Sequence, residues 1–425
     1  MKNFMYLIPL AAVALASCSN ESLDSQEQRA ATNPGTALNI FPAVQGITRG
    51  TITTDGNLTE FKVIAAGSDD FYTTTENVAP DVTVAGIGPS FEKTVTLDAI
   101  SGKWWIAGEG ESNENTYYWW KSKNMTASFT AYAPIDIRET STSSTSDYQV
   151  KNDLANQQDI IVAYNSGSGS DFTSGVPLNF QHVMSQVIIK ALNKDASSTK
   201  IEVAGIRLSN LKNTGTLTLP TSSTASGTFS WDSYTPWSVN NNTTYTYTDR
   251  GTDALAGTLT DNNTKIVTLT SAATQLTDTP FLLMPQTTGK ADLTVQPVNE
   301  GAYISVLIRV TNIYDTDNLA AGQVTYPTWT IADGAPAAGT QFAYVAIPVD
   351  IDWKAGYKYT YTLNFSKDGI GKVDPEFADN YSGEGYPTGT NGANPGEDVF
   401  DSPVSLFFTV TVDEWTDGGN SSLDM

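Results

Sequence analysis

Few residues in this sequence are of the types that catalyse reactions. The chain has one histidine, His182, and one cysteine, Cys18, and no glycine-rich phosphate loop. It therefore lacks the residues for a His/Cys metal cluster or a Cys–His nucleophile. Asp350 and Asp352 lie on one face of an expected strand, and glycosidases use two carboxyls about 5 to 9.5 Å apart. A solvated sheet edge explains the same pair, and a structural hydrogen bond explains His182, so we predict no catalytic residues, metal or cofactor.

Two aromatic clusters have residue types that bind sugars. They are "KWWI" and "YYWWK", with Trp104, Trp105, Trp119 and Trp120. Exposed tryptophans stack on sugar rings, which would make the protein a monomeric surface lipoprotein that binds glycans. Strand alternation offers another explanation, because alternate members would pack in the core and their neighbours would lie on the surface.

The N-terminal segment has the pattern of an export signal. "MKNFMYLIPLAAVALASCSNES" has a basic Lys2, an apolar run and small residues, which is typical of a secretory signal and too short for a membrane span. It ends in "LASC", which resembles the lipobox of bacterial lipoproteins, where the cysteine thiol is acylated. We expect a signal peptide at 1–17, lipidation by chains such as palmitate at Cys18, and a polar tether at 18–36. An ordinary cleaved signal with an incidental cysteine is the alternative.

Composition favours strands and excludes one class of partner. The formal net charge is −23 and charged residues are 16% of the chain, so little basic surface is available for nucleic acid. The 9 Trp, 19 Tyr and 16 Phe, with many Thr and Val, favour β structure.

Alternating apolar residues with Gly, Asn and Asp between them predict an all-β fold of β-sandwiches. Residues 152–164 could hold one or two helical turns. The expected strands are 61–66, 93–100, 127–134, 185–192, 200–211, 264–271, 291–298, 301–313, 341–351, 357–366 and 403–415. The Thr/Ser/Asn-rich segment 212–263 is a linker or a set of long hairpin loops, and the domain boundary is placed at 215–216.

Several segments, in order, resemble the fimbrillin family, the type V pilins built from surface lipoproteins. They are the lipobox, "ITRGT", "YYWWKSKNMTASFTAYAP", "VPLNFQHVMSQVIIKAL", "VAGIRLSNLKNTGTLTL", "FLLMPQTTG", "IDWKAGYKYTYTLNFS" and "FFTVTVDEW". The resemblance implies two tandem β-sandwich domains of transthyretin-like or Greek-key type, at 50–215 and 216–425. It also implies a non-enzymatic structural subunit of a cell-surface fimbrium that serves adhesion, whether as shaft, tip or anchor.

The resemblance further implies how such a subunit assembles. A precursor anchored in the outer membrane by its lipid is cut by an arginine-specific, trypsin-like protease, and then exchanges strands with other copies of itself or related fimbrial subunits. Residues 37–49 would be the removable N-terminal strand, with the cut between Arg49 and Gly50. A rival cut between Arg29 and Ala30 would release the lipid and leave the strand. The apolar positions of the removable strand are Leu38, Ile40, Val44 and Ile47.

The C-terminal strand has the pattern of a donor. Residues 403–415 carry apolar side chains at every second position, and these are Val404, Leu406, Phe408, Val410 and Val412. A donated strand brings backbone hydrogen bonds and a row of apolar anchors. The same segment could instead be the last core strand of the second domain.

The lipid anchor is tested by substituting its attachment residue. Fatty-acid labelling of growing cells should tag the wild-type precursor. Cys18→Ser should abolish the label and move the protein to soluble fractions, because the acceptor thiol is gone. Unchanged labelling of the Cys18→Ser protein would contradict the lipoprotein prediction.

Overall fold

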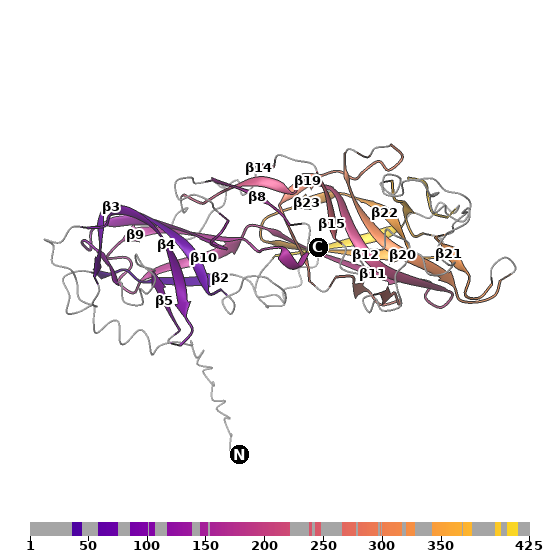
Figure 1. Cartoon of the computed structure of the whole chain (residues 1–425), viewed down its shortest axis with the longest axis horizontal. Coiled ribbons are helices and arrows are strands. Elements are labelled where there is room, and N and C mark those ends of the chain that lie inside the picture. The colour runs from indigo at the N-terminus through magenta and orange to yellow at the C-terminus, as the bar shows by residue number, and fades with distance from the viewer. Residues whose placement is uncertain are drawn as a thin grey trace, which may run out of the picture.

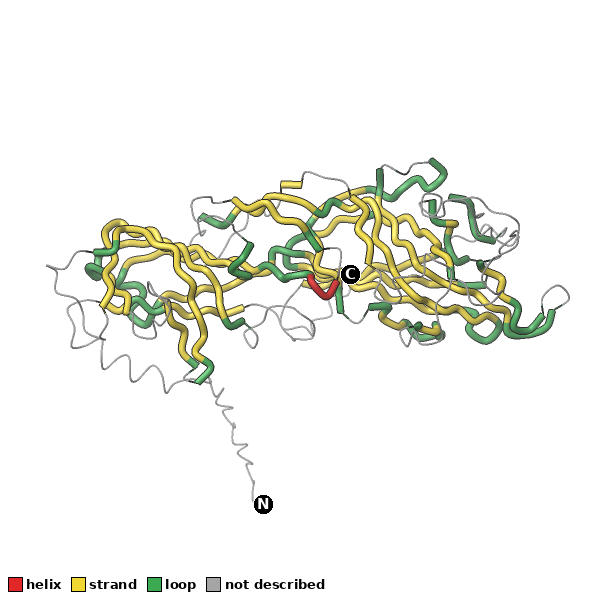
Figure 2. Tube along the Cα trace, viewed as in Figure 1, coloured by secondary structure: helices red, strands yellow, loops and turns green. Residues whose placement is uncertain are grey.

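The computed structural model shows an elongated, two-lobed molecule built almost entirely of strands (Figures 1 and 2). A single 3-10 turn, Leu154–Asn156, is the only helical element among the described residues (Figure 2). The predicted all-β fold is therefore confirmed. The described residues are 36–44, 58–74, 86–100, 102–106, 117–137, 145–151, 154–221, 238–239, 243–247, 266–277, 279–295, 298, 300–316, 320–327, 342–367, 369–375, 396–400 and 406–414.

The first lobe is one nine-stranded sheet in the order β1-β6-β3-β7-β9-β10-β2, with β4 and β5 added beside β3. Alternation in its strands places one face inward: Phe61, Val63 and Ala65 of β3 are fully buried. The strands are β1 (Thr36–Ala37), β2 (Ile40–Val44), β3 (Glu60–Thr74), β4 (Gly88–Asp98), β5 (Lys103–Ile106), β6 (Tyr117–Trp120), β7 (Thr126–Ala133), β9 (Ile161–Ser168) and β10 (Val176–His182).

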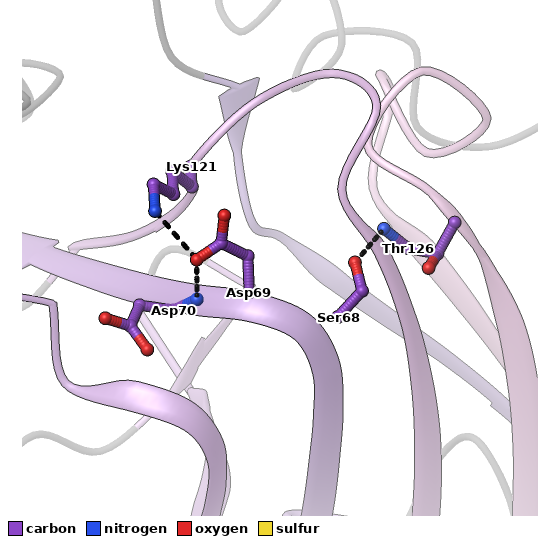
Figure 3. A network of polar contacts seen from close by, with 5 residues as sticks. All are labelled: Ser68, Asp69, Asp70, Lys121 and Thr126. Carbon is purple, nitrogen blue, oxygen red and sulfur yellow. Dashed lines mark hydrogen bonds and ion pairs between the residues drawn. The ribbon is translucent and has the colours of Figure 1, made fainter.

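A polar network fixes the bend in β3 where the strand changes register (Figure 3). Lys121 Nζ lies 2.7 Å from Asp69 Oδ1, and the Asp70 N–H donates to the same oxygen. The hydrogen bond from Lys121 is the main reason that the pKa of Asp69 lies below its ordinary value. Nearby, the Thr126 N–H donates to Ser68 Oγ. These contacts join β3 to the loop between β6 and β7 and to the first residue of β7.

The second lobe is a sandwich of a five-stranded sheet (β17-β11-β24-β26, with β18) and a seven-stranded sheet (β15-β12-β20-β22-β25, with β16 and β21), accompanied by smaller sheets β14-β13-β8 and β19-β23. Its strands are β8 (Thr145–Gln149), β11 (Ser185–Asn193), β12 (Thr199–Leu211), β13 (Thr214–Thr218), β14 (Ser238–Val239), β15 (Thr243–Tyr247), β16 (Val267–Thr268), β17 (Thr274–Gln275), β18 (Phe281–Leu283), β19 (Gln286–Thr288), β20 (Ala302–Asn312), β21 (Val324–Tyr326), β22 (Ala343–Val349), β23 (Ile351–Trp353), β24 (Tyr357–Phe365), β25 (Lys372–Val373) and β26 (Phe407–Glu414).

The seven-stranded sheet is covered on both faces, so β12 is buried along most of its length rather than alternately. Its outer face holds a buried ion pair, Arg207 to Asp374, at 2.6 Å. The guanidinium also lies 4.6 Å from the ring centre of Tyr344. A charge here is tolerated because it is paired and hydrogen-bonded.

β10 belongs to the nine-stranded sheet and β11 to the five-stranded sheet, and the larger hydrophobic core also takes in Tyr132 of β7 and Val162 of β9. The sequence placed the division at 215–216, in the polar segment. β11 and β12 belong to the sheets of the second sandwich, and β8 pairs with β13; the domain division at 215–216 stays a prediction.

Two expected strands differ in the structure. Among the described residues 266–271, only Val267–Thr268 is a strand. Residues 291–298 were expected as a strand and that expectation is wrong, because their described residues form loop and turn. Asp292 Oδ1 accepts hydrogen bonds from both the N–H and the hydroxyl of Thr294. Such a side-chain turn competes with strand pairing, while Leu293 still packs inward.

Candidate functional site

The candidate site is the edge of the first sheet, where β2 lies against β10 (Figure 1). The two strands run parallel, from Ile40 opposite Val176 to Val44 opposite Phe180. The Val176 N–H donates to the Asn39 carbonyl at 2.8 Å. β2 is the last strand on that side of the sheet, so a single ladder holds it.

Two apolar side chains anchor this N-terminal segment. Leu38 and Ile40 are buried in the first core, whereas Phe41 and Ala43 are exposed. Burying a side chain of this size contributes about 1.5 to 3 kcal/mol. The Leu38 N–H also donates to the Tyr118 carbonyl in β6. The side chains of this segment are thus part of the core, while its backbone lies at the edge of the sheet.

β10 depends on β2 over most of its length. Its other neighbour, β9, pairs with it at Gln181 and His182, so among the described strands residues 176–180 pair with β2 alone. The Pro177 carbonyl is satisfied by the side-chain amide of Asn165. Taking β2 away would leave the inward-facing stretch of β10 without a ladder partner, which is costly for backbone groups.

Proline residues fit this ladder on both strands. Successive residues of a strand aim their backbone groups at opposite edges, and Val176 aims at β2. Pro177 therefore aims away from β2, where it needs no donor. Asn39 aims at β10, so Pro42 aims at the open side of the sheet. A missing N–H there discourages a further strand from adding to β2.

Gly175 makes room for the outward face of β2. Its φ is +112°, a region that other residues rarely adopt, and a Cβ at this position would lie 2.1 Å from Cε2 of Phe41. The Phe41 ring therefore covers the glycine. The segment is therefore held on two sides: Leu38 and Ile40 pack into the core, and the Phe41 ring packs over Gly175 on the outer side.

The predicted cut lies next to this edge in the sequence, but outside the described residues. Cys18, Arg29, Ala30, Ile47, Arg49, Gly50 and Val404 all lie outside them. Arg49 belongs to 45–57, the segment that joins β2 to β3. Its cleavage, and the lipid at Cys18, stay predictions.

The C-terminal candidate strand, β26, is also an edge strand. It pairs antiparallel with β24 and ends the five-stranded sheet. Leu406 and Phe408 are half-buried against the second core. Val410 and Val412, on the same face, are 41% and 53% exposed. The strand is therefore paired with β24 along its whole length, while this face is packed at Leu406 and Phe408 and exposed at Val410 and Val412.

The part of β24 that faces Phe408 is buried. Phe408 lies 6.2 Å from the ring centre of Tyr361, and burial raises the pKa of that tyrosine to about 12. The Tyr361 hydroxyl accepts a hydrogen bond from Trp353. The apolar face of β26 thus continues a packed core instead of starting a separate cluster.

The residues considered for chemistry have structural partners. His182 Nδ1 lies 2.8 Å from Asp159 Oδ2, and both side chains are buried. Asp350 and Asp352 are exposed and accept hydrogen bonds from the Lys290 N–H and the Thr287 hydroxyl. Within the described residues, no group of three or more His, Cys, Asp or Glu is placed to hold a metal ion.

The exposed tryptophans that the glycan-binding alternative requires are not found in β6. Trp119 and Trp120 are 2% and 1% exposed, and the Trp119 indole donates to the Thr74 hydroxyl. Trp104, in β5, is half-buried against Phe61. Core packing, the other explanation for these tryptophans, holds for both Trp119 and Trp120, although strand alternation would have buried only one of the two neighbours.

Sequence reasoning missed the receiving half of the site. β10 was not among the expected strands, although Val176, Leu178 and Phe180 alternate and are fully buried. That alternation was the available signal. Gly175 gave no signal, because its role depends on where Phe41 lies in the folded chain.

Comparison with known proteins decides the family. The sequence model described as fimbrillin-like matches residues 75–379. The chain belongs to the fimbrillin-like family. No curated protein matches the fimbrillin-like chain. Among its described residues, no helix has the length and hydropathy needed to cross a membrane.

Solved structures similar to the fimbrillin-like chain include three candidate cell adhesion proteins. One from Bacteroides uniformis is 15% identical, with 90% of this chain and 100% of that chain covered and a TM-score of 0.37. One from Bacteroides ovatus is 12% identical, covering 78% and 93%, with a TM-score of 0.39. One from Parabacteroides distasonis is 10% identical, covering 90% and 100%, with a TM-score of 0.39.

The anchoring of β2 is tested by truncating one inward side chain. Ile40→Ala should lower the free energy of unfolding of the first lobe by about 2 to 5 kcal/mol, the usual result for a buried isoleucine. Ala43→Ser, at an exposed position of the same strand, should change it by less than about 0.5 kcal/mol. Urea denaturation measures both. Equal effects would show that β2 is not seated in the core.

Proposed function

We propose that this protein is a structural subunit of a cell-surface fimbrium that serves adhesion, and that it polymerises by exchanging its N-terminal strand. The observation that carries the proposal is that, among the described strands, residues 176–180 of β10 pair with β2 alone. A core strand with one peripheral, separable partner is suited to accept another strand in its place. Membership of the fimbrillin-like family supports the same role.

Export would follow from the N-terminal segment. Residues 1–17 act as a signal peptide, and Cys18 carries acyl chains that hold the precursor in the outer membrane. Each buried methylene contributes about 0.8 kcal/mol, so more than one chain gives firm anchoring. In this state the precursor is at the cell surface with β2 in place.

An arginine-specific, trypsin-like protease then cuts between Arg49 and Gly50. This cut separates β2 from β3, so β1 and β2 stay attached by contacts alone. A cut between Arg29 and Ala30 would remove the lipid but leave β2 covalently joined to its lobe. Only the cut after Arg49 can therefore open the edge of β10.

The covalent link explains why exchange waits for proteolysis. While β2 is tethered, its effective concentration at β10 is high, in the millimolar range for a short linker. Any incoming strand must compete with it. After the cut, a displaced β2 can diffuse away, and the competition ends in favour of the strand that binds more tightly.

The incoming strand would come from residues 403–415 of another copy or of a related subunit. Its five apolar positions contribute about 8 to 15 kcal/mol gross, before ordering costs. β26 is suited to leave its own sheet because it is an edge strand with exposed Val410 and Val412. Repeating this head-to-tail contact gives an open filament.

Substitution of the cleaved arginine tests the mechanism. The Arg49→Ala precursor, made without its signal and lipid and treated with trypsin, should stay monomeric because β2 remains tethered. Arg29→Ala is the matched control and should form a ladder of SDS-resistant oligomers like the wild type. Electrophoresis under SDS reads both. Normal polymer from the Arg49→Ala protein would overturn the proposed function.

A further inference from the structure

Along its described strands, the chain passes between the two lobes three times: from β7 to β8, from β8 to β9, and from β10 to β11. Since β7 and β9 pair with each other, the chain returns from β8 to the place that it left. Domains are usually joined by exposed, flexible linkers, which let them move. Here a buried residue of the larger core stands at each crossing instead, and these are Ile137, Ile160, Val183 and Met184.

We infer that a clasp, made of residues 145–151 and 154–160, locks the two lobes in one orientation, so that the subunit moves as a single rigid body. Relative motion is the usual behaviour of joined domains unless the interface between them is large and hydrophobic. The inference goes beyond the proposed function and does not depend on strand exchange. In a filament of such subunits, bending would be confined to the contacts between subunits.

The first half of the clasp is joined to the second lobe by backbone hydrogen bonds. β8 pairs antiparallel with β13 along its whole length. Directly after β8, the Val150 N–H donates to the Asn213 carbonyl at 2.8 Å, and the Val150 side chain is buried in the larger core. The Thr130 hydroxyl of β7 donates to the Pro220 carbonyl, just after β13. A tilt of one lobe against the other would have to break these backbone pairings together, which is costly.

The second half of the clasp begins at the 3-10 turn, which lies between the two lobes (Figure 2). Leu154 and Ile160 are buried in the same core as the strands of the second lobe. Between them, Gln157 is 3% exposed and its Oε1 accepts from the Leu282 N–H of β18 at 2.7 Å. Its Nε2 donates to the Lys151 carbonyl. Separating the lobes would leave a buried amide and a strand N–H without partners, which is unfavourable.

The clasp ends where β10 passes into β11. The Asp159 carboxylate lies 2.8 Å from His182 Nδ1, and both side chains are buried. The Val183 N–H donates to the Ile160 carbonyl at 3.0 Å. A hinge needs a few residues whose backbone angles can change. Because the residues at this crossing are held by both side-chain and backbone contacts to the clasp, the crossing does not serve as a hinge.

The distance between two spin labels reports the orientation of the lobes. A chain made without residues 1–18 has no cysteine of its own. Ser166→Cys in β9 and Asp352→Cys in β23 then place one label on each lobe, at exposed positions. Double electron–electron resonance gives the distribution of the distance between the labels.

Two double variants separate the clasp from general core packing. Leu154→Ala with Gln157→Ala weakens the clasp. Leu208→Ala with Gln286→Ala is the matched control, because it removes a buried leucine and a glutamine that binds backbone groups within the second lobe alone. Both variants should melt at a lower temperature than the parent, since each loses part of a packed core. Circular dichroism measures the melting and shows whether each variant is folded.

The labelled parent should give one narrow distance distribution. The clasp variant should widen it about two-fold, because its lobes can then move separately, and the control should keep the narrow distribution. If the double clasp variant does not fold, Gln157→Ala alone replaces it and should widen the distribution less. A wide distribution in the parent would overturn the inference. So would equal widths in the control and in the clasp variant that folds.

Discussion

The parallel ladder between β2 and β10 is the interaction on which the rest of this structure depends. Residues 176–180 of β10 face the first core with Val176, Leu178 and Phe180, yet their described ladder partner is a five-residue strand at the edge of the sheet. Backbone groups on a core strand must be paired, and their pairing here is supplied by a short strand at the edge of the sheet. The first lobe is therefore complete only while some strand fills that position.

The first lobe requires a strand beside β10, and the second lobe has an edge strand that could supply one. The first lobe has a core strand whose partner is peripheral, and the second has an edge strand, β26, that is only half packed. Leu406 and Phe408 continue the second core beside Tyr361, whereas Val410 and Val412 extend past it. Under the proposed function, such a subunit would lend a strand from its second lobe and receive one in its first. A contact of this kind is heterologous, and heterologous contacts that do not close into a ring give filaments.

The sequence predicted the all-β fold and most long strands, because period-two alternation is visible in stretches such as β24. It predicted less well where side chains compete with the ladder. Asp292 binds Thr294 and makes a turn out of an apparently alternating segment. The sequence alone also could not show that Trp119 is buried, because its burial depends on packing against both faces of β6. Leu38 and Ile40 were identifiable from their pattern, but Gly175 was not, because a glycine has meaning only once its neighbour Phe41 is placed. The cut at Arg49 and the lipid at Cys18 lie outside the described residues and stay predictions.

Residue-resolved amide exchange along β10 tests the central claim most directly. In the uncut precursor the amides of Val176, Leu178 and Phe180 should exchange slowly, because they face β2. After the cut and removal of β2 from the monomer they should exchange much faster, while Asn179, which faces the other edge, should change little. In the polymer the three amides should be protected again. Unchanged protection of these amides in all three states would contradict the account, since it would mean that β10 does not depend on a replaceable strand.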